Sequence, residues 1–121
     1  MKILIVDDDK DIIDIIVNFL ELKYLPDKMK IYKATNGKDA LNIALKEFPD
    51  LIITDLDMPV MDGASFIKEL RKRYIEVPVL AISAHSVFKD NYKEYKANEF
   101  IKKPIDPDEL YQKIETILKI V

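Results

Sequence analysis

The sequence contains no cysteine and one histidine among its 121 residues. Without cysteine the chain forms neither disulfides nor thiolate metal sites. It also has no excess of basic residues, because 19 Lys and Arg stand against 22 Asp and Glu, with a net charge of -3 and a pI near 5.2. A chain with this balance cannot neutralise a run of phosphates, so we expect no direct nucleic-acid partner.

A long apolar run is missing as well. Residues 3–6 are apolar, but three aspartates follow them, and such a segment is too short for a signal peptide or a membrane span. We therefore expect a cytoplasmic location and no membrane partner. What the sequence does have is 49% hydrophobic residues, enough for the core of one compact domain over residues 1–121.

Short apolar segments alternate with helical patterns along the chain. Expected strands are 3–6, 31–33, 51–54, 79–82 and 100–102; expected helices cover 12–22, 87–96 and segments that Asn36, Asp62 and Asp106 begin as caps. Continuous apolar strands separated by helices are typical of parallel sheets covered on both faces. The pattern therefore predicts an α/β fold with a five-stranded parallel sheet and five βα units.

Polar residues follow four of these strands. They are Asp7, Asp8 and Asp9 after the first, Asp55 and Asp57 after the third, Ser83, Ala84 and His85 after the fourth, and Lys103 and Pro104 after the fifth. In a parallel α/β sheet, ligands bind beyond the carboxyl ends of the strands. We therefore expect these residues to meet at one edge of the sheet.

The residue types at that edge predict phosphoryl chemistry. Crowded carboxylates without cysteine or a histidine cluster favour a hard cation, and Mg²⁺ fits this oxygen-rich set best. A lysine and a hydroxyl beside the cation favour an anionic ligand such as phosphate, and a carboxylate can itself be the nucleophile. Taken singly, each residue is more typical of a helix cap or an ordinary strand end. Four strand ends together make coincidence a weak explanation.

At these residues the sequence resembles the receiver domain of two-component response regulators, including the stand-alone chemotaxis type. The resemblance extends over essentially the whole chain. Its motifs are Ile3-Leu-Ile-Val-Asp-Asp-Asp9, Thr54-Asp-Leu-Asp-Met-Pro-Val-Met-Asp-Gly63, Ser83-Ala84 and Lys103-Pro104. It implies the flavodoxin-like doubly wound (βα)5 topology with strand order 2-1-3-4-5.

The resemblance also implies a role for each residue of the site. Asp55 is the expected phosphoacceptor. The expected Mg²⁺ ligands are Asp7, Asp8, Asp55 and the backbone carbonyl of Asp57, whose side chain faces the incoming nucleophile. Phosphoryl oxygens are expected to contact Ser83, Lys103 and the backbone N–H groups of Asp57 and Ala84. His85 is expected to line the site, at a position where side chains tune the lifetime of the phosphoryl group.

Three further expectations concern the backbone and the switch, and the resemblance implies two of them, the switch pair and the cis peptide bond. Ser83 and Phe100 are the expected switch pair, in which the hydroxyl moves toward the phosphoryl group and the aromatic ring turns inward. Ordinary core packing is the competing interpretation of Phe100. We expect a cis peptide bond between Lys103 and Pro104. Gly63 fits either a positive φ or a close approach of two backbone segments.

The function that the resemblance implies is that of a phosphoacceptor in a phosphorelay. Asp55 would receive the phosphoryl group from a phosphohistidine on a histidine kinase or histidine phosphotransfer domain, with Mg²⁺, and lose it by hydrolysis. We expect no enzymatic activity beyond this self-directed chemistry. The expected first helix carries a second apolar stripe (Ile12, Ile15, Phe19 and Leu22) besides the residues that face the core. We expect this second stripe either to dock a partner helix pair or to pack beneath the last helix. A homodimer is a further expected association.

Two alternatives stay open. Asp55-Leu56-Asp57 also resembles the Asp-x-Asp of haloacid-dehalogenase-type phosphatases, but there the motif follows the first strand, and 121 residues leave no room for the usual cap. The other alternative is a receiver fold that only binds partners and is never phosphorylated. The sequence departs from the receiver pattern between Ser83 and Lys103, which are about two residues closer than usual.

Overall fold

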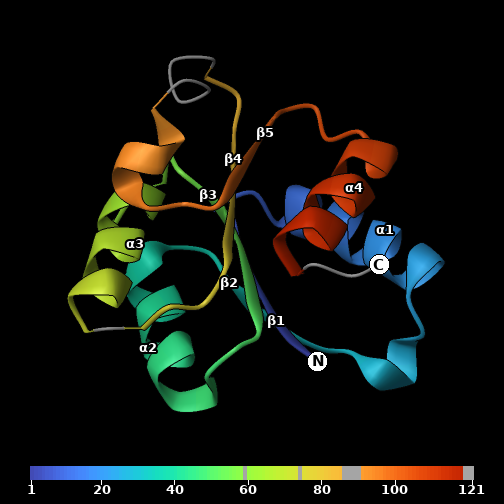
Figure 1. Ribbon diagram of the computed structural model, residues 1–121, viewed down its shortest axis with the longest axis horizontal. Helices are drawn as coiled ribbons and strands as arrows, with labels where there is room; N and C mark the ends of the chain where they lie inside the picture. Colours follow the sequence, from blue (N-terminus) through green and yellow to red (C-terminus); the bar gives the residue numbers. More distant parts are fainter. Residues whose placement is uncertain (59, 74, 86–90, 119–121) are drawn as a thin grey trace.

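Five strands and four α-helices alternate along the chain in the computed structural model, which describes all residues except 59, 74, 86–90 and 119–121 (Figure 1). Two short 3₁₀-helices, η1 and η3, complete the described elements. Their order is β1 (Lys2–Val6), α1 (Lys10–Lys23), η1 (Pro26–Lys28), β2 (Lys30–Ala34), α2 (Gly37–Glu47), β3 (Leu51–Asp55), α3 (Gly63–Lys72), β4 (Val79–Ser83), η3 (Tyr92–Tyr95), β5 (Glu99–Lys102) and α4 (Pro107–Leu118).

The strands form one parallel sheet in the order β2-β1-β3-β4-β5. In β1, which lies between β2 and β3, Ile3 is opposite Ile31 of β2 on one side and Leu51 of β3 on the other. Both the parallel sheet and the predicted strand order are therefore confirmed. The chain leaves β1 for the β2 edge and then returns to β3, so the order reverses between the ends of β1 and β3. This reversal leaves a crevice at the carboxyl ends of β1 and β3, where Asp7 and Asp55 lie.

Helices cover both faces of the sheet (Figure 1). Successive residues of β1 point to opposite faces: Ile3 and Ile5 join the core beneath α1 and α4, whereas Leu4 and Val6 join the core beneath α2 and α3. All four side chains are fully buried. This two-sided burial is the reason that β1 is apolar at consecutive positions rather than at alternate ones.

Aspartate or asparagine side chains cap four helices, three of them at positions that the sequence predicts. Each accepts a hydrogen bond from a backbone N–H of the first turn. The pairs are Asp9 with Asp11 at 2.9 Å, Asn36 with Asp39 at 2.9 Å, Asp62 with Ser65 at 2.7 Å and Asp106 with Glu109 at 3.0 Å. Within the described ranges, no helix has both the length and the apolar character that crossing a membrane requires.

The connection from β4 to β5 differs from the prediction of a helix over 87–96. Residues 87–90 of that helix lie outside the described residues. In the described part of this fourth βα unit, the 3₁₀-helix η3 stands in place of the predicted helix. Hydrogen bonds from the N–H of Glu94 to Asn91 O (3.0 Å) and of Lys96 to Lys93 O (2.9 Å) span three residues. Lys96 then takes a left-handed conformation, and the N–H of Asn98 bonds to Val79 O at 2.8 Å. The short connection thus returns to the sheet before an α-helical turn can continue.

The first helix divides its apolar residues between the core and the surface. Ile13, Ile16 and Leu20 are buried against the sheet. Of the second stripe, Ile12 and Phe19 are partly buried against the same core, while Ile15 and Leu22 are 41% and 81% exposed. Packing near α4 therefore accounts for only part of the stripe, and the rest faces outward.

Candidate functional site

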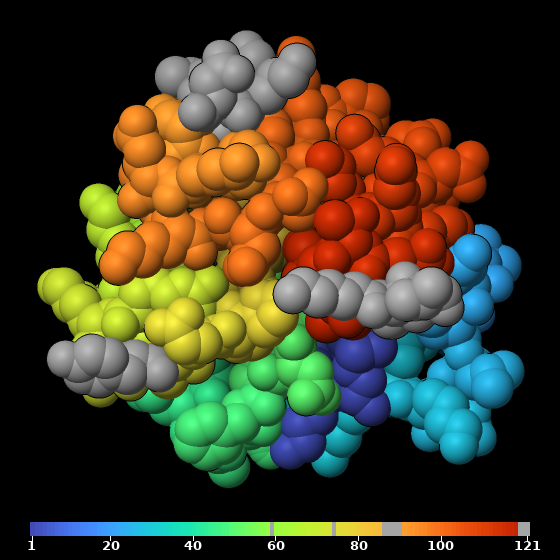
Figure 2. Space-filling view, in the orientation of Figure 1, coloured from blue at the N-terminus to red at the C-terminus, as the bar shows by residue number. Residues whose placement is uncertain are grey.

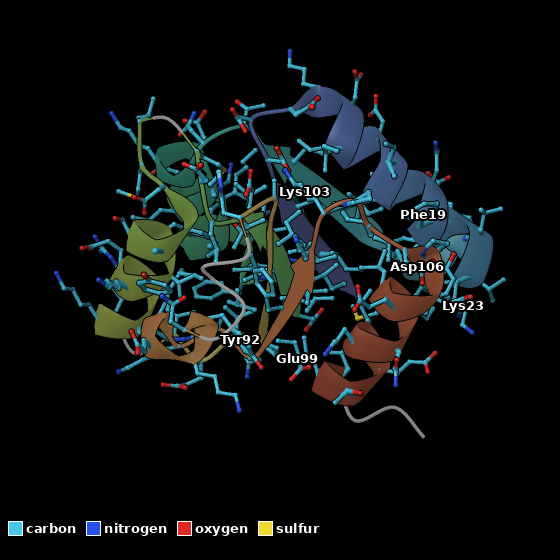
Figure 3. All side chains as sticks on the ribbon, turned by 90° about the horizontal axis from the view of Figure 1, so that it is seen from above. Phe19, Lys23, Tyr92, Glu99, Lys103 and Asp106 are labelled. Carbon is cyan, nitrogen blue, oxygen red and sulfur yellow. The ribbon has the colours of Figure 1, made fainter. Side chains whose placement is uncertain are left out.

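The predicted site residues come together at the carboxyl ends of β1, β3, β4 and β5. Asp7 directly follows β1, Asp55 and Ser83 are the last residues of β3 and β4, and Lys103 follows β5. Lys103 lies in the connection between β5 and α4, at this edge of the sheet (Figure 3). The parallel arrangement alone brings these four residues to the same edge, although they are far apart in the sequence.

Three carboxylates form the acidic part of the site. One oxygen from each of Asp7, Asp8 and Asp55 lies within 4.8 Å of the others. Asp7 is fully buried and Asp55 is 4% exposed, whereas Asp8 is exposed. Two buried carboxylates and one exposed carboxylate this close together repel strongly unless a cation lies among them.

Lys103 places a positive charge against both buried aspartates. Its Nζ lies 3.3 Å from Asp55 Oδ2, to which it donates a hydrogen bond, and 2.8 Å from Asp7 Oδ2. The second contact is a short buried ion pair, so Lys103 is the charged partner of Asp7 Oδ2. The other oxygen, Asp7 Oδ1, accepts from the N–H of Asp9 at 2.9 Å.

Burial and mutual repulsion dominate the protonation of the two buried acids. Burial raises the pKa of Asp7, and Lys103 only partly offsets it. Burial also raises the pKa of Asp55, and the neighbouring charge of Asp7 raises it further. Burial lowers the pKa of Lys103, but its contacts with Asp7 and Asp55 outweigh that effect and raise the pKa overall. One lysine therefore does not fully offset the two buried carboxylates, an imbalance that favours either protonation of one of them or binding of a further cation.

The described residues fit Mg²⁺ by their chemistry. The three carboxylates offer only hard oxygen ligands, and two of them are buried beside a single lysine. Mg²⁺ needs few protein oxygens because it keeps several of its waters. Asp7, Asp8 and Asp55 are therefore the residues that would hold the ion.

Asp57 contacts both Asp55 and the single histidine. The N–H of Asp57 donates to Asp55 Oδ1 at 3.2 Å, so this backbone donor is directed to the Asp55 carboxylate. Its side chain is 64% exposed, and Oδ2 lies 3.0 Å from Nε2 of His85. Sequence reasoning placed both residues at the site but missed their contact, because it joins two loops whose approach depends on the packing of β3 beside β4.

Ser83 and Phe100, the predicted switch pair, both lie inside the fold. Ser83 is fully buried, and its Oγ accepts a hydrogen bond from the N–H of His85 at 3.0 Å. Phe100 is 7% exposed and stacks on Tyr92 with ring centroids 5.9 Å apart. Ala84, whose N–H was expected in the phosphoryl cradle, is exposed at the end of β4. Phe100 therefore combines core packing with a position on the strand next to Ser83.

Backbone packing behind Asp55 explains the glycine at the start of α3. Gly63 does not have a positive φ; a Cβ at this position would collide with the backbone carbonyl of Asp55. Close approach, one of the two predicted reasons, is therefore the one that holds. The hydroxyl of Thr54 donates to the same carbonyl at 2.9 Å, a contact that the sequence did not reveal. The Lys103–Pro104 peptide bond is cis, as predicted.

Comparisons with known proteins agree with this fold and site. The family model for the response regulator receiver domain matches residues 3–115. Among curated relatives, "Probable transcriptional regulator ycf27" of Porphyridium aerugineum is 35% identical over 99% of this chain and 49% of its own length. "Transcriptional regulatory protein PrrA" of Mycobacterium tuberculosis is 32% identical over 98% of this chain and 50% of its own length. The chain thus spans about half the length of these relatives.

Solved structures give the same result. The receiver domain of the Francisella response regulator 1452 superposes with a TM-score of 0.85 at 32% identity, covering 98% of this chain and 96% of that one. The response regulator TrrA of Thermotoga maritima, solved in complex with Mg²⁺-BeF, has a TM-score of 0.83 at 28% identity and covers 96% of this chain and 97% of its own. This chain belongs to the family of response regulator receiver domains.

Proposed function

We propose that Asp55 is the phosphoacceptor of a two-component phosphorelay and that its phosphorylation depends on Mg²⁺. The observation that carries the proposal is the environment of the Asp55 carboxylate. Oδ2 contacts Lys103, Oδ1 contacts the N–H of Asp57, and the carboxylates of Asp7 and Asp8 stand beside it. Such an arrangement orients a nucleophile and provides for the charge on a transferred phosphoryl group.

The transfer would exchange one bond to phosphorus for another. An Asp55 oxygen attacks the phosphorus of a partner's phosphohistidine, the P–N bond breaks, and the imidazole leaves with its electron pair and takes up a proton. Lys103, already beside Asp55 and Asp7, pairs with a phosphoryl oxygen, and Ser83 and the N–H of Ala84 supply further donors from the end of β4. Bound Mg²⁺ would supply positive charge against the oxygens of the transferring group. Water later releases inorganic phosphate and regenerates the Asp55 carboxylate.

A groove beside the site suits the partner in this exchange. Ile12, Ile15, Asn18, Phe19, Pro104 and Ile105 line a hollow of about 340 Å³ between α1 and the β5–α4 connection. Three residues of the second α1 stripe, Ile12, Ile15 and Phe19, line it, and its residue Pro104 directly follows Lys103 in the chain. We propose that a helical histidine kinase or phosphotransfer domain binds here with its histidine directed to Asp55. The location would be cytoplasmic, and no other substrate would be turned over.

Labelling by a small phosphodonor tests the acceptor. Incubation with acetyl phosphate and Mg²⁺ should add one phosphoryl group, detected by intact-mass spectrometry, and chelation of Mg²⁺ should abolish the addition. Asp55→Asn should not be labelled, whereas Asp27→Asn, a change at an exposed aspartate outside the site, should be labelled like the wild type. Equal labelling of Asp55→Asn, or sustained turnover of phosphomonoesters, would refute the proposal.

A groove variant separates partner binding from chemistry. Ile15 is 41% exposed, so Ile15→Glu should leave the fold and the reaction with acetyl phosphate unchanged. The same variant should slow transfer from a phosphorylated histidine kinase, because it places a charge in an apolar interface. If both phosphodonors slow equally, the groove is not the docking surface.

A further inference from the structure

A second hollow lies away from the phosphorylation site, between the last turn of α3 and the 3₁₀-helix η3. It measures about 300 Å³ and is lined by Lys68, Arg71, Lys72, Glu94, Tyr95 and Lys96. We call these six residues the basic groove. In the space-filling view, the segments of α3 and η3 meet on one face of the molecule, on the left in Figure 2. Because η3 is short, it leaves the side of this α3 turn uncovered.

The charge of the basic groove is opposite to that of the whole chain. Four of its six residues are cationic and one is acidic, whereas the chain carries a net charge of -3. Lys72 pairs with Glu69 at 3.3 Å, but the lysine is 74% exposed, so this ion pair neutralises little. Lys68 lies over the ring of Tyr95, 5.5 Å from its centroid, which positions the ammonium group at the groove without cancelling its charge.

Arg71 forms a fixed wall of the groove. Its Nη1 donates to the carbonyls of Ile75 at 2.7 Å and Val77 at 2.8 Å, and its Nη2 donates to the carbonyl of Lys96 at 3.0 Å. These bonds tie the end of α3 to the end of η3. The lysines of the basic groove therefore project from two elements that are already held together, and little ordering is needed when a ligand binds.

The donors of the groove suit carboxylates better than phosphate. Phosphate sites commonly use a free guanidinium fork or converging backbone N–H groups. Here the guanidinium directs its donors to main-chain carbonyls. The exposed charges are three lysines at positions 68, 72 and 96 and one acid, Glu94. Exposed lysines along an open groove attract acidic side chains over a distance and select partners by charge.

We propose that the basic groove is a docking surface for an acidic segment of a partner protein, separate from the groove that serves phosphotransfer. The occupant is an extended or helical segment rich in Glu and Asp, with an apolar side chain against Tyr95. Binding of the acidic segment does not require phosphorylation of Asp55. Either proposal, the docking surface or the phosphoacceptor function, can therefore fail while the other stands.

Titration of the unphosphorylated chain with a short peptide rich in glutamate tests the proposal. Binding should be weak and salt-sensitive, and backbone amide NMR shifts should concentrate in residues 68–72 and 92–98. Lys68→Glu combined with Lys72→Glu should weaken binding about tenfold, because it replaces two attractive exposed charges by repulsive ones. Lys28→Glu combined with Lys38→Glu makes the same charge change at exposed sites elsewhere and should weaken it less than about twofold.

Circular dichroism melts should show that both double variants fold, since all four lysines are exposed. Equal weakening by the two double variants would overturn the proposal, since it would show attraction to net charge alone. Amide shifts elsewhere in the chain, or binding of single-stranded DNA in place of the peptide, would overturn it as well. Retained peptide binding in Asp55→Asn is the result expected if the two surfaces are independent.

Discussion

Replacing Asp55 by asparagine should stabilise the metal-free protein. One oxygen of Asp55 lies within 4.8 Å of Asp7, and at an effective dielectric constant of about 20 this repulsion is about 3.5 kcal/mol. Desolvation destabilises the ionised Asp55 carboxylate by several kcal/mol more. Attraction to Lys103 at 3.3 Å stabilises it by about 5 kcal/mol. The balance agrees with the raised pKa of Asp55. Since Lys103 keeps its contact with Asp7, we expect a net gain in unfolding free energy of about 1–3 kcal/mol.

The size of this stabilisation depends on pH. A carboxyl whose pKa is raised in the folded state contributes stability below the ordinary pKa of 3.8, and that contribution is lost as pH rises through the folded pKa. The ionised Asp55 carboxylate therefore destabilises the wild type at pH 7 but not at acidic pH. The advantage of Asp55→Asn should accordingly be present near neutrality and disappear below about pH 4.

Urea unfolding of the two proteins in chelator, at several pH values, measures this difference. Asp27→Asn, an exposed change of equal charge, should shift stability by less than about 0.5 kcal/mol. Added Mg²⁺ should stabilise the wild type more than Asp55→Asn, because a ligand that binds only the folded state adds free energy by mass action. A variant less stable than the wild type at pH 7, or a gain that persists at acidic pH, would refute the electrostatic reasoning.

Three other perturbations follow from contacts in the structure. Gly63→Ala should lower the unfolding free energy by more than about 2 kcal/mol in urea titration, because its Cβ meets the carbonyl of Asp55; an unchanged midpoint would contradict the close approach. Tyr24→Phe should raise stability by about 1 kcal/mol, because the buried Tyr24 hydroxyl has no hydrogen-bond partner among the described residues. Burial raises the pKa of Tyr24, so wild-type stability should fall as pH rises above 10.0. The Phe variant should lose less stability over the same pH range, and equal alkaline melting curves for the two proteins would contradict this. His85→Ala, which removes the 3.0 Å contact with Asp57 beside the acceptor, should speed phosphate release from the phosphorylated chain, and an unaltered release rate would show that the contact does not shield Asp55.

The sequence by itself determined the parallel sheet, most of its element order and the identity of the site. Five apolar segments between helical patterns were sufficient because strands buried on both faces must be apolar at consecutive positions. The residues that follow those strands were sufficient to predict the site, since parallel strands bring their carboxyl ends to one edge. Capping at Asn36, Asp62 and Asp106 was also predictable, because it depends on residues only three positions apart.

Only the tertiary structure decided how neighbouring segments meet. It showed that Gly63 is needed for the approach of α3 to Asp55, that His85 contacts Asp57, and that η3 replaces a helical turn. The basic groove likewise depends on Arg71 joining two chain segments that are separated by 25 positions. A local pattern reports which face of an element is apolar and where it starts, because those properties depend on near neighbours. Distances between loops on different strands depend on the packing of the whole fold, and no short stretch of sequence contains that information.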